Sequence, residues 1–254
     1  MEETKKRGLS GAVLKWIALV TMLIDHIGLT VVYQALIYDR DLWLNDTMMT
    51  LYAVLRSVGR LAFPLFCFLL AEGFRHTSSR GKYLLRLAVF ALLSEIPFDL
   101  AVNSRVIEFS SQNVFFTLLL GLAGIWAWDY FTDGKLKDCE LPRLLAALTC
   151  MAAAVWAGSL LSTDYQALGV LLILAFYLLR ERPWLRDLSA ALIFCGMVWL
   201  EGSWRIELFA LLALPLMHLY NGERGRQIKY FFYCFYPGHF LLLSLLRWII
   251  MQAK

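Results

Sequence analysis

Long runs of apolar residues alternate with short polar clusters along the chain. A helix needs roughly 20 apolar residues to cross a bilayer core, so the alternation is typical of a polytopic membrane protein. We predict an all-α transmembrane helix bundle of about nine spans, within a range of roughly eight to ten, that forms one domain over residues 1–254. The expected spans are 11–38, 48–74, 82–102, 112–131, 142–161, 165–180, 185–200, 205–220 and 229–251.

The composition supports this class and excludes two others. Hydrophobic residues make up 60% of the chain and charged residues only 17%. A soluble domain is less apolar and more charged, and a disordered chain needs low hydrophobicity with high net charge. The chain is therefore expected to contact membrane lipids.

The positions of the basic residues explain the net charge of +4. Most of the 24 lysines and arginines fall in the loops that share a side with the N-terminus if the predicted spans alternate in direction. Cytoplasmic loops are enriched in Lys and Arg, so we predict a cytoplasmic N-terminus. The basic excess is then a topology signal, and no nucleic-acid partner is expected.

A few ionisable residues lie deep inside the predicted spans. A charged group near the bilayer centre costs about 2.5–3.5 kcal/mol on insertion scales, so such residues are functional candidates by default. The predicted directions of their spans bring them to similar depth, and one shared polar site would satisfy them all. They are Asp25, His26, Arg60, Glu95 and His239.

Helical geometry divides the neighbours Asp25 and His26. Successive helical residues point about 100° apart, so each side chain meets a different neighbour. Arg56 and Arg60 share one helix face, and we expect Asp25 to pair with one of them, which leaves the imidazole free for chemistry. A buried ion pair that only fixes helix register remains the alternative. No metal site is expected, since no cluster has ligand spacing.

The segment "RHTSSRGKYLLR" combines cations with hydroxyl groups at the start of a predicted helix. It is either a plain topology signal or a site where Arg, Lys and helix N-terminal amides hold phosphates. The cations are Arg75, Arg80, Lys82 and Arg86.

Six segments, in order along the chain, resemble the TraX family of membrane proteins. They are "LKWIALVTMLIDHIG", "GRLAFPLFCFLLAEGFRHT", "YLLRLAVFALLSEIPFDL", "NVFFTLLLGL", "DYQALGVLLI" and "FYPGHFLLL". The family's named activity is N-terminal acetylation of conjugative pilin, and it is similar to multispanning acyltransferases that use cytoplasmic acetyl-CoA. The resemblance implies an acetyl-CoA-dependent acetyltransferase in a bacterial cytoplasmic membrane, without implying a pilin substrate.

Under that resemblance, His26 is the expected general base or acetyl carrier. Arg60 would stabilise the oxyanion or hold Asp25, and Glu95 or His239 would orient groups or relay protons. The cations Arg75, Arg80, Lys82 and Arg86 are the candidates for CoA phosphates. The acceptor, a peptide N-terminus or a glycan or cell-envelope hydroxyl, would approach Asn113, Asp164 and Tyr165 near the outer helix ends.

Two other classes compete with this interpretation. Midplane Asp, His, Glu and Arg also describe the proton relay of a proton-coupled transporter, although no pair of matching interrupted segments marks an inverted repeat. A non-catalytic assembly factor that holds a partner helix is the third class, and it predicts no acyl donor.

Overall fold

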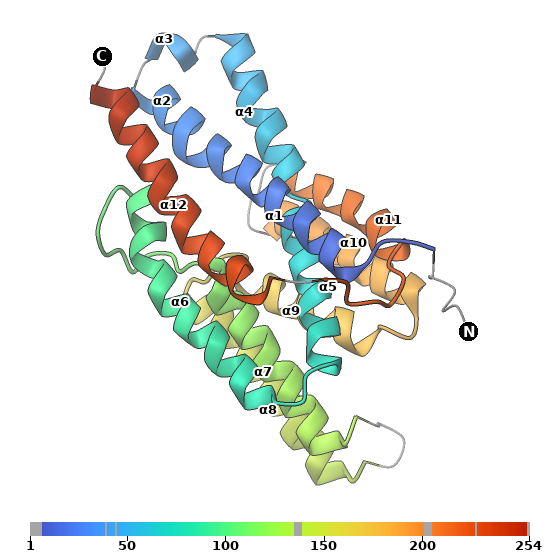
Figure 1. The fold of residues 1–254 in the computed structure, drawn as a ribbon. Coiled ribbons are helices and arrows are strands. Elements are labelled where there is room, and N and C mark those ends of the chain that lie inside the picture. The colour runs from blue at the N-terminus through green and yellow to red at the C-terminus, as the bar shows by residue number, and fades with distance from the viewer. Residues whose placement is uncertain are drawn as a thin grey trace. The chain divides into compact units, whose positions relative to one another are not determined.

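The computed structural model describes residues 7–38, 40–43, 45–134, 139–200, 205–226 and 228–252. These residues form helices and no named strand, which confirms the all-α prediction (Figure 1). Two isolated β-bridges, Leu9 with Tyr220 and Gln112 with Thr163, join loops. The elements are α1 (Gly11–Ile27), the π-helix η1 (Gly28–Val32), α2 (Tyr33–Tyr38), α3 (Arg40–Trp43), α4 (Asp46–Gly59), α5 (Ala62–Arg75), α6 (Arg80–Val102), α7 (Val114–Thr132), α8 (Leu141–Leu160), α9 (Gln166–Leu178), α10 (Pro183–Leu200), the 3₁₀ helix η2 (Arg205–Leu212), α11 (Ala213–His218) and α12 (Lys229–Gln252).

Five stretches of the described chain are long and apolar enough to cross a membrane. Two further apolar helices, Gln166–Leu178 and Ile206–His218, are shorter than a clean span. The protein is thus a helical membrane protein, while the number of nine spans stays a prediction. The five stretches are Gly11–Tyr38, Asp46–Arg75, Val114–Thr132, Leu141–Leu160 and Tyr230–Ile250.

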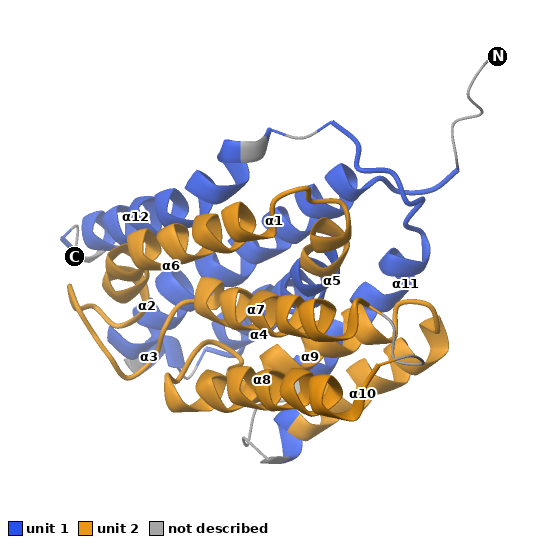
Figure 2. Cartoon of the chain, turned by 90° about the horizontal axis from the view of Figure 1, so that it is seen from below, with its two compact units in different colours: residues 1–69, 197–254 blue, residues 70–196 orange. Residues whose placement is uncertain are grey.

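The chain divides into two compact units, which Figure 2 shows in different colours. Unit 1 combines both ends of the chain, Met1–Leu69 and Met197–Lys254, and unit 2 is the continuous segment Leu70–Gly196. One domain over residues 1–254 stays a prediction. Each unit is described below by itself.

Two of the expected continuous helices are interrupted in unit 1. Within the expected span 48–74, α4 ends at Gly59 and α5 begins at Ala62. Pro64 has no N–H, so it cannot bond the carbonyl of Arg60 one turn earlier, and the helix breaks there. The expected span 11–38 contains a π-helical segment, η1, between α1 and α2.

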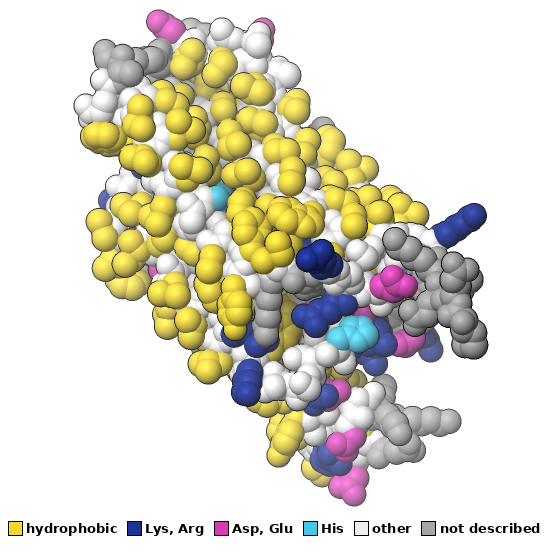
Figure 3. Space-filling view, in the orientation of Figure 1, with side chains coloured by type: hydrophobic (Ala, Val, Ile, Leu, Met, Phe, Trp, Pro, Cys, Tyr) yellow, Lys and Arg dark blue, Asp and Glu magenta, His cyan; other side chains and the backbone are white. Residues whose placement is uncertain are grey.

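The face of α12 seen in Figure 3 carries mainly hydrophobic side chains. Leu242 is 65% exposed and Trp248 is 60% exposed, and several leucines and isoleucines beside them are also exposed. A membrane helix has no need to hide such side chains, because lipid tails are as apolar as leucine. The exposed apolar face of α12 therefore fits a lipid-facing span.

Close packing in unit 2 depends on glycines of α7. A Cβ atom added at Gly124 would lie 2.9 Å from a methyl carbon of Leu174, and one added at Gly121 would collide with Ile173. Small residues let membrane helices approach closely, so these positions let α9 pack against α7.

Candidate functional site

Asp25 and His26, two residues of the site, lie side by side near the end of α1, a helix that is capped at its start. Ser10 caps α1 by accepting a hydrogen bond from the amide of Val13. The residues that follow, as far as Ile24, are apolar except for Lys15 and Thr21. Asp25 is only 6% exposed. A Cβ added at Gly59 would collide with the side chain of Asp25, so α4 approaches α1 closely only because residue 59 is glycine.

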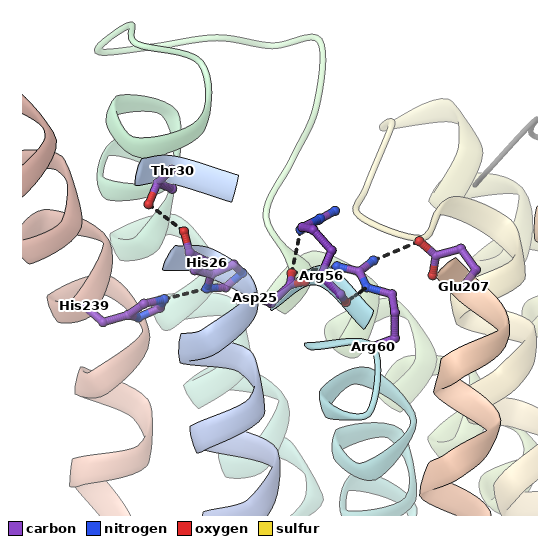
Figure 4. Close-up of polar contacts among 7 residues, drawn as sticks. All are labelled: Asp25, His26, Thr30, Arg56, Arg60, Glu207 and His239. Atoms are coloured by element: carbon purple, nitrogen blue, oxygen red, sulfur yellow. Dashed lines mark hydrogen bonds and ion pairs between the residues drawn. The ribbon is translucent and has the colours of Figure 1, made fainter. Parts of the chain in front are cut away.

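Four charged side chains of unit 1 form an ion network, defined here as Asp25, Arg56, Arg60 and Glu207 (Figure 4). The Oδ2 atom of Asp25 accepts hydrogen bonds from Arg56 at 2.7 Å and from Arg60 at 2.6 Å. Arg60 also donates to Glu207 at 2.9 Å and, through Nε, to the carbonyl of Arg56 at 3.3 Å. The predicted pairing of Asp25 is present with both arginines, and two acids balance two bases.

The donors of Arg60 are directed at protein groups. Each of its three guanidinium nitrogens donates to Asp25, Glu207 or the Arg56 carbonyl. Of the two roles expected for Arg60, this arrangement favours holding Asp25 over stabilising an oxyanion, because the second role would require breaking a buried ion pair.

His26 turns away from the ion network and meets His239 of α12 (Figure 4). The Nδ1 atom of His26 lies 2.6 Å from the Nε2 atom of His239. The two rings are nearly parallel, at 13°, with centroids 4.9 Å apart, which fits an in-plane hydrogen bond between the edges of the rings. Phe240 packs against both rings at centroid distances of 4.4 Å.

The backbone of α12 determines which nitrogen carries each proton. The Nδ1 atom of His239 lies 2.9 Å from the carbonyl oxygen of Phe235, and a carbonyl can only accept. With both rings neutral, His239 therefore donates from Nδ1 and accepts at Nε2, so His26 donates from Nδ1. The Nε2 atom of His26 keeps its lone pair. We call the chain of Phe235 carbonyl, His239 and His26 the histidine relay.

A π-helical segment begins two residues after His26. In η1 the hydroxyl of Thr30 donates to the carbonyl of His26 at 2.6 Å, and Figure 4 shows this contact. Short π-helical turns are rare and occur frequently at functional sites. The backbone thus leaves the regular α-helical pattern two residues after His26.

Glu95 belongs to unit 2, where it hydrogen-bonds to Asn113. Asn113 also donates to the carbonyl of Ala91 at 2.9 Å, and its side-chain oxygen caps α7 by accepting from the amide of Phe115. One oxygen of Glu95 and the buried hydroxyl of Ser94 have no hydrogen-bond partner among the described residues. That Glu95 shares a site with the residues of unit 1 stays a prediction.

The three residues expected at the acceptor side lie at one end of unit 2. The amide of Asp164 donates to the carbonyl of Gln112 at 2.9 Å, and the carbonyl of Asp164 accepts from Thr117, so α7 and the loop before α9 are joined there. Tyr165 has a φ of 61°, a conformation uncommon for a bulky side chain. Asn113 is fully buried and serves as a helix cap.

Two of the four cations expected to hold CoA phosphates already contact carboxylates. Arg75 pairs with Glu72 at 3.0 Å, and Arg80 pairs with Asp129 at 2.5 Å. The guanidinium of Arg86 lies over the ring of Tyr83, and Lys82 is exposed. A cavity of about 740 Å³ in unit 2 has Arg80 and Asp129 in its lining, together with Arg143 and Asp133, which form a second ion pair.

Sequence reasoning missed two members of the site. Glu207 is an acid in an apolar segment, so the rule that selected Asp25 applies to it as well. Its position beside the predicted start of a span concealed that signal. The carbonyl of Phe235 carries no sequence signal, because every residue has one.

This fold and this site define a class: a helical membrane protein with a balanced ion network and a separate histidine relay inside its apolar spans. The model of the TraX protein family matches residues 10–247, and the chain belongs to that family. The match includes both units.

A curated relative is 31% identical over 252 residues, which cover 91% of this chain and 92% of the relative. It is the probable fimbrial assembly protein FimC, serogroup H1, of Dichelobacter nodosus. No solved structure matches the chain.

Proposed function

We propose that the protein is an integral membrane acetyltransferase that moves an acetyl group from cytoplasmic acetyl-CoA to an acceptor at or beyond the outer face of a bacterial inner membrane. The observation that carries this proposal is the histidine relay, in which the Phe235 carbonyl and His239 leave Nε2 of His26 as a base. A neutral imidazole is the group that acyl transfer needs for proton movement near neutral pH.

Nε2 of His26 can carry the proton through the whole reaction. As the acceptor amine or hydroxyl attacks the thioester carbonyl, Nε2 of His26 removes its proton and a C–N or C–O bond forms. When the tetrahedral intermediate collapses, the C–S bond breaks and Nε2 returns the proton to the CoA thiolate. His239 accepts from Nδ1 of His26 throughout, so it holds the ring and stabilises the transient imidazolium, as the acid of a catalytic triad does.

The same atom would serve if an acetyl-histidine forms. In that route Nε2 attacks the thioester carbonyl, an N–C bond forms, the C–S bond breaks and CoA leaves as the thiolate. The acceptor then attacks the acetyl-imidazole, the bond from the acetyl carbon to Nε2 breaks, and the freed Nε2 takes the acceptor's proton and passes it to the thiolate. Release of CoA before any acceptor is added is the signature of this route, so a rapid-quench measurement without acceptor separates the two.

Of the two arginines, Arg56 is better placed to donate hydrogen bonds to an oxyanion. Only one hydrogen bond from its guanidinium is described, the one from Nη1 to Asp25. Its side chain is 18% exposed, against 7% for Arg60. We assign the positioning of Asp25 to Arg60 and the developing negative charge to Arg56.

The support for the acceptor class comes from the relative rather than from the site. The relative is named as a probable fimbrial assembly protein, and this supports a fimbrial subunit as the acceptor. A peptide N-terminal amine fits the base chemistry of His26, and a glycan hydroxyl uses the same steps.

The test is acetyl transfer by purified protein in nanodiscs, with acetyl-CoA carrying a labelled acetyl group and an N-terminal fimbrial-subunit peptide as acceptor. Mass spectrometry of the peptide measures the product. We expect His26→Ala to lower the rate roughly 10²–10⁴-fold, the range of general-base catalysis. His218→Ala, which removes an exposed histidine of unit 1, is the matched control and is expected to retain the wild-type rate.

The same preparation separates the competing classes. A proton-coupled transporter would acidify proteoliposomes with its cargo and would show no acetylated product. Acetyl-CoA raises the melting temperature of an acetyltransferase by mass action. If neither a stability shift nor acetylated peptide is found with the wild-type protein, the proposal is wrong.

A further inference from the structure

The loop after α11 is attached to the start of α1 by a set of backbone hydrogen bonds. Leu9 donates to Leu219 at 2.7 Å and accepts from Asn221 at 3.0 Å. The amides of Gly11 and Ala12 donate to the carbonyls of Glu223 and Arg224 at 2.8 and 3.0 Å. We call this arrangement of residues 9–12 with 219–224 the terminal clip. These hydrogen bonds hold the backbone of the loop against the start of α1.

Gly225 continues the close approach. Its φ is +67°, and an added Cβ would lie 2.6 Å from the hydroxyl oxygen of Ser10 and 2.9 Å from the Cβ of Ala12. Only glycine meets both requirements without strain. The cations Arg224 and Arg226, on either side of it, are therefore presented at a defined place beside the start of α1.

Lys15 extends this basic cluster one turn into α1. Lys15 comes three residues after Ala12, whose amide donates to the carbonyl of Arg224, and the Lys15 ammonium lies 5.1 Å from the centroid of the Phe232 ring. Trp16 contacts the rings of Phe231 and Phe232 at 5.4 and 5.3 Å. Trp16 and Phe231 stay 42% and 39% exposed, so cations and open aromatic surface occur together.

The cluster is in register with the histidine relay. Lys15 and His26 are 11 residues apart on the apolar first span, which is close to three whole turns, so they share a face about 16 Å apart. Phe232 and His239 are 7 residues apart on α12, close to two turns, and also share a face. A ligand with an anionic head at Lys15 and a reactive end at His26 must have an extended arm of that length.

We propose that the terminal clip, with Lys15, Arg224, Trp16 and Phe231, binds the nucleotide end of a CoA thioester whose arm follows α1 to His26. Lysine and arginine bind phosphate oxygens by charge-assisted hydrogen bonds. An exposed aromatic face stacks on a nucleobase. The pantetheine arm supplies the separation between the phosphates and the thioester. This inference rests on the proposed acetyltransferase function and locates its donor site in unit 1.

The experiment measures acetyl-CoA affinity by isothermal titration in phosphatidylcholine nanodiscs. Loss of one charged hydrogen bond weakens binding roughly ten- to hundredfold, and we expect that loss for Lys15→Gln and for Arg224→Gln. Lys15→Arg keeps the charge and is expected to restore most of the affinity. Turnover of acetyl-pantetheine, which has no phosphate or base, is expected to be the same in wild type and both Gln variants.

Arg182→Gln is the matched control, since Arg182 is an exposed arginine of unit 2 in the turn between α9 and α10. Unchanged acetyl-CoA affinity in Lys15→Gln and Arg224→Gln overturns the inference and leaves the proposed function intact. So does a loss of affinity in Arg80→Gln without one in Arg224→Gln, which returns the donor site to the loop of Arg75 to Arg86. Failure of acetyl-CoA to bind the wild-type protein overturns both proposals.

An anionic lipid headgroup shares the phosphate chemistry of CoA, and a second arm separates these sources. Nanodiscs containing phosphatidylglycerol are compared with phosphatidylcholine nanodiscs, and co-purifying lipid is measured by mass spectrometry. If the Gln variants lose bound phosphatidylglycerol and keep wild-type acetyl-CoA affinity, the cluster is a lipid site. Competition between phosphatidylglycerol and acetyl-CoA at Lys15 would instead support the donor site.

Discussion

Asp25 and His26 are adjacent in the sequence, and their surroundings in unit 1 differ in kind. Asp25 ends in a network whose two acids and two bases balance, and Arg60 donates from all three guanidinium nitrogens. His26 ends in the histidine relay, which fixes one ring nitrogen and leaves the other with a lone pair. Two adjacent residues of α1 thus contact different surroundings, one a charge-balanced ion network and the other a pair of histidines that leaves a basic nitrogen at its end.

The difference shows how a buried polar group can be assigned a role. A balanced network with its donors used by the protein stabilises a packing arrangement, and breaking it costs folding free energy. The histidine relay ends in a nitrogen with a lone pair, which can take a proton from a ligand. Asp25, Arg60 and Glu207 should therefore respond mainly in stability, and the histidine relay mainly in rate, while Arg56, which we assign to the developing negative charge, should affect both.

The largest effect is expected from Asp25→Leu. It leaves Arg56 without its described acidic partner and Arg60 without one of its two acidic partners. Losing one member of a buried ion pair costs about 3–5 kcal/mol. The free energy of unfolding is measured by denaturant titration in mixed micelles, with His26→Gln as the control that removes no network charge. Wild-type stability for Asp25→Leu would show that the network carries no packing role.

Substitution of His239 tests the relay. His239→Leu removes the acceptor for Nδ1 of His26, so the His26 ring is no longer held in one orientation. We expect the transfer rate to fall about a hundredfold, the cost of a small misplacement of a catalytic group. His239→Gln can present a carbonyl oxygen to the same N–H and is expected to recover most of the rate. Equal losses in the two variants would mean that His239 contributes packing and not orientation.

Gly59→Ala tests the close approach of α4 to Asp25. The added methyl group collides with the Asp25 side chain, and overpacking of this kind costs about 1–3 kcal/mol. Gly238→Ala, where an added Cβ meets no heavy atom within 4 Å, is the matched control and is expected to keep the wild-type melting temperature. A stable Gly59→Ala protein would show that α1 and α4 can move apart without loss.

The smallest effect is expected at Glu108, in the exposed loop between α6 and α7. Its pKa lies below the ordinary 4.5, because its carboxylate accepts from the amide of Ser110 and pairs with Arg105. A lowered folded-state pKa contributes stability above the unfolded value that is lost as the pH falls through the folded value. The melting temperature of Glu108→Gln should thus be slightly lower than that of the wild type at pH 6, and the two should converge in strong acid. A large difference at pH 6 would contradict the weakness expected of exposed pairs.

Periodicity and burial cost predicted much of unit 1. An acid in an apolar helix must find a basic partner, and the spacing of Arg56 and Arg60 placed both on one face, so the pairing of Asp25 followed from the sequence. The choice of His239 as the partner of His26 did not, because it depends on which helices pack together. The π-helical turn at Gly28–Val32 also escaped prediction, since its residues are equally compatible with a regular helix.

The site in unit 2 shows the limit of the same rule. Glu95 was selected by its depth in an apolar helix, as Asp25 was, and its described partner is the amide of Asn113 rather than a charge. Depth alone predicts that a group will be satisfied, and it does not predict by what. Asn113 was expected near an acceptor, yet its amide and its oxygen are used by the carbonyl of Ala91 and the amide of Phe115.

The histidine relay joins residues 213 positions apart, one in α1 and the other in α12. A ribosome makes the chain from its N-terminus, so His26 enters the membrane long before the helix that carries His239 and the Phe235 carbonyl has been synthesised. The base can acquire its orientation only when α12 has been inserted. A chain truncated before α12 therefore lacks an oriented base even when α1 is in place, and the order of synthesis delays chemistry until α12 has been added.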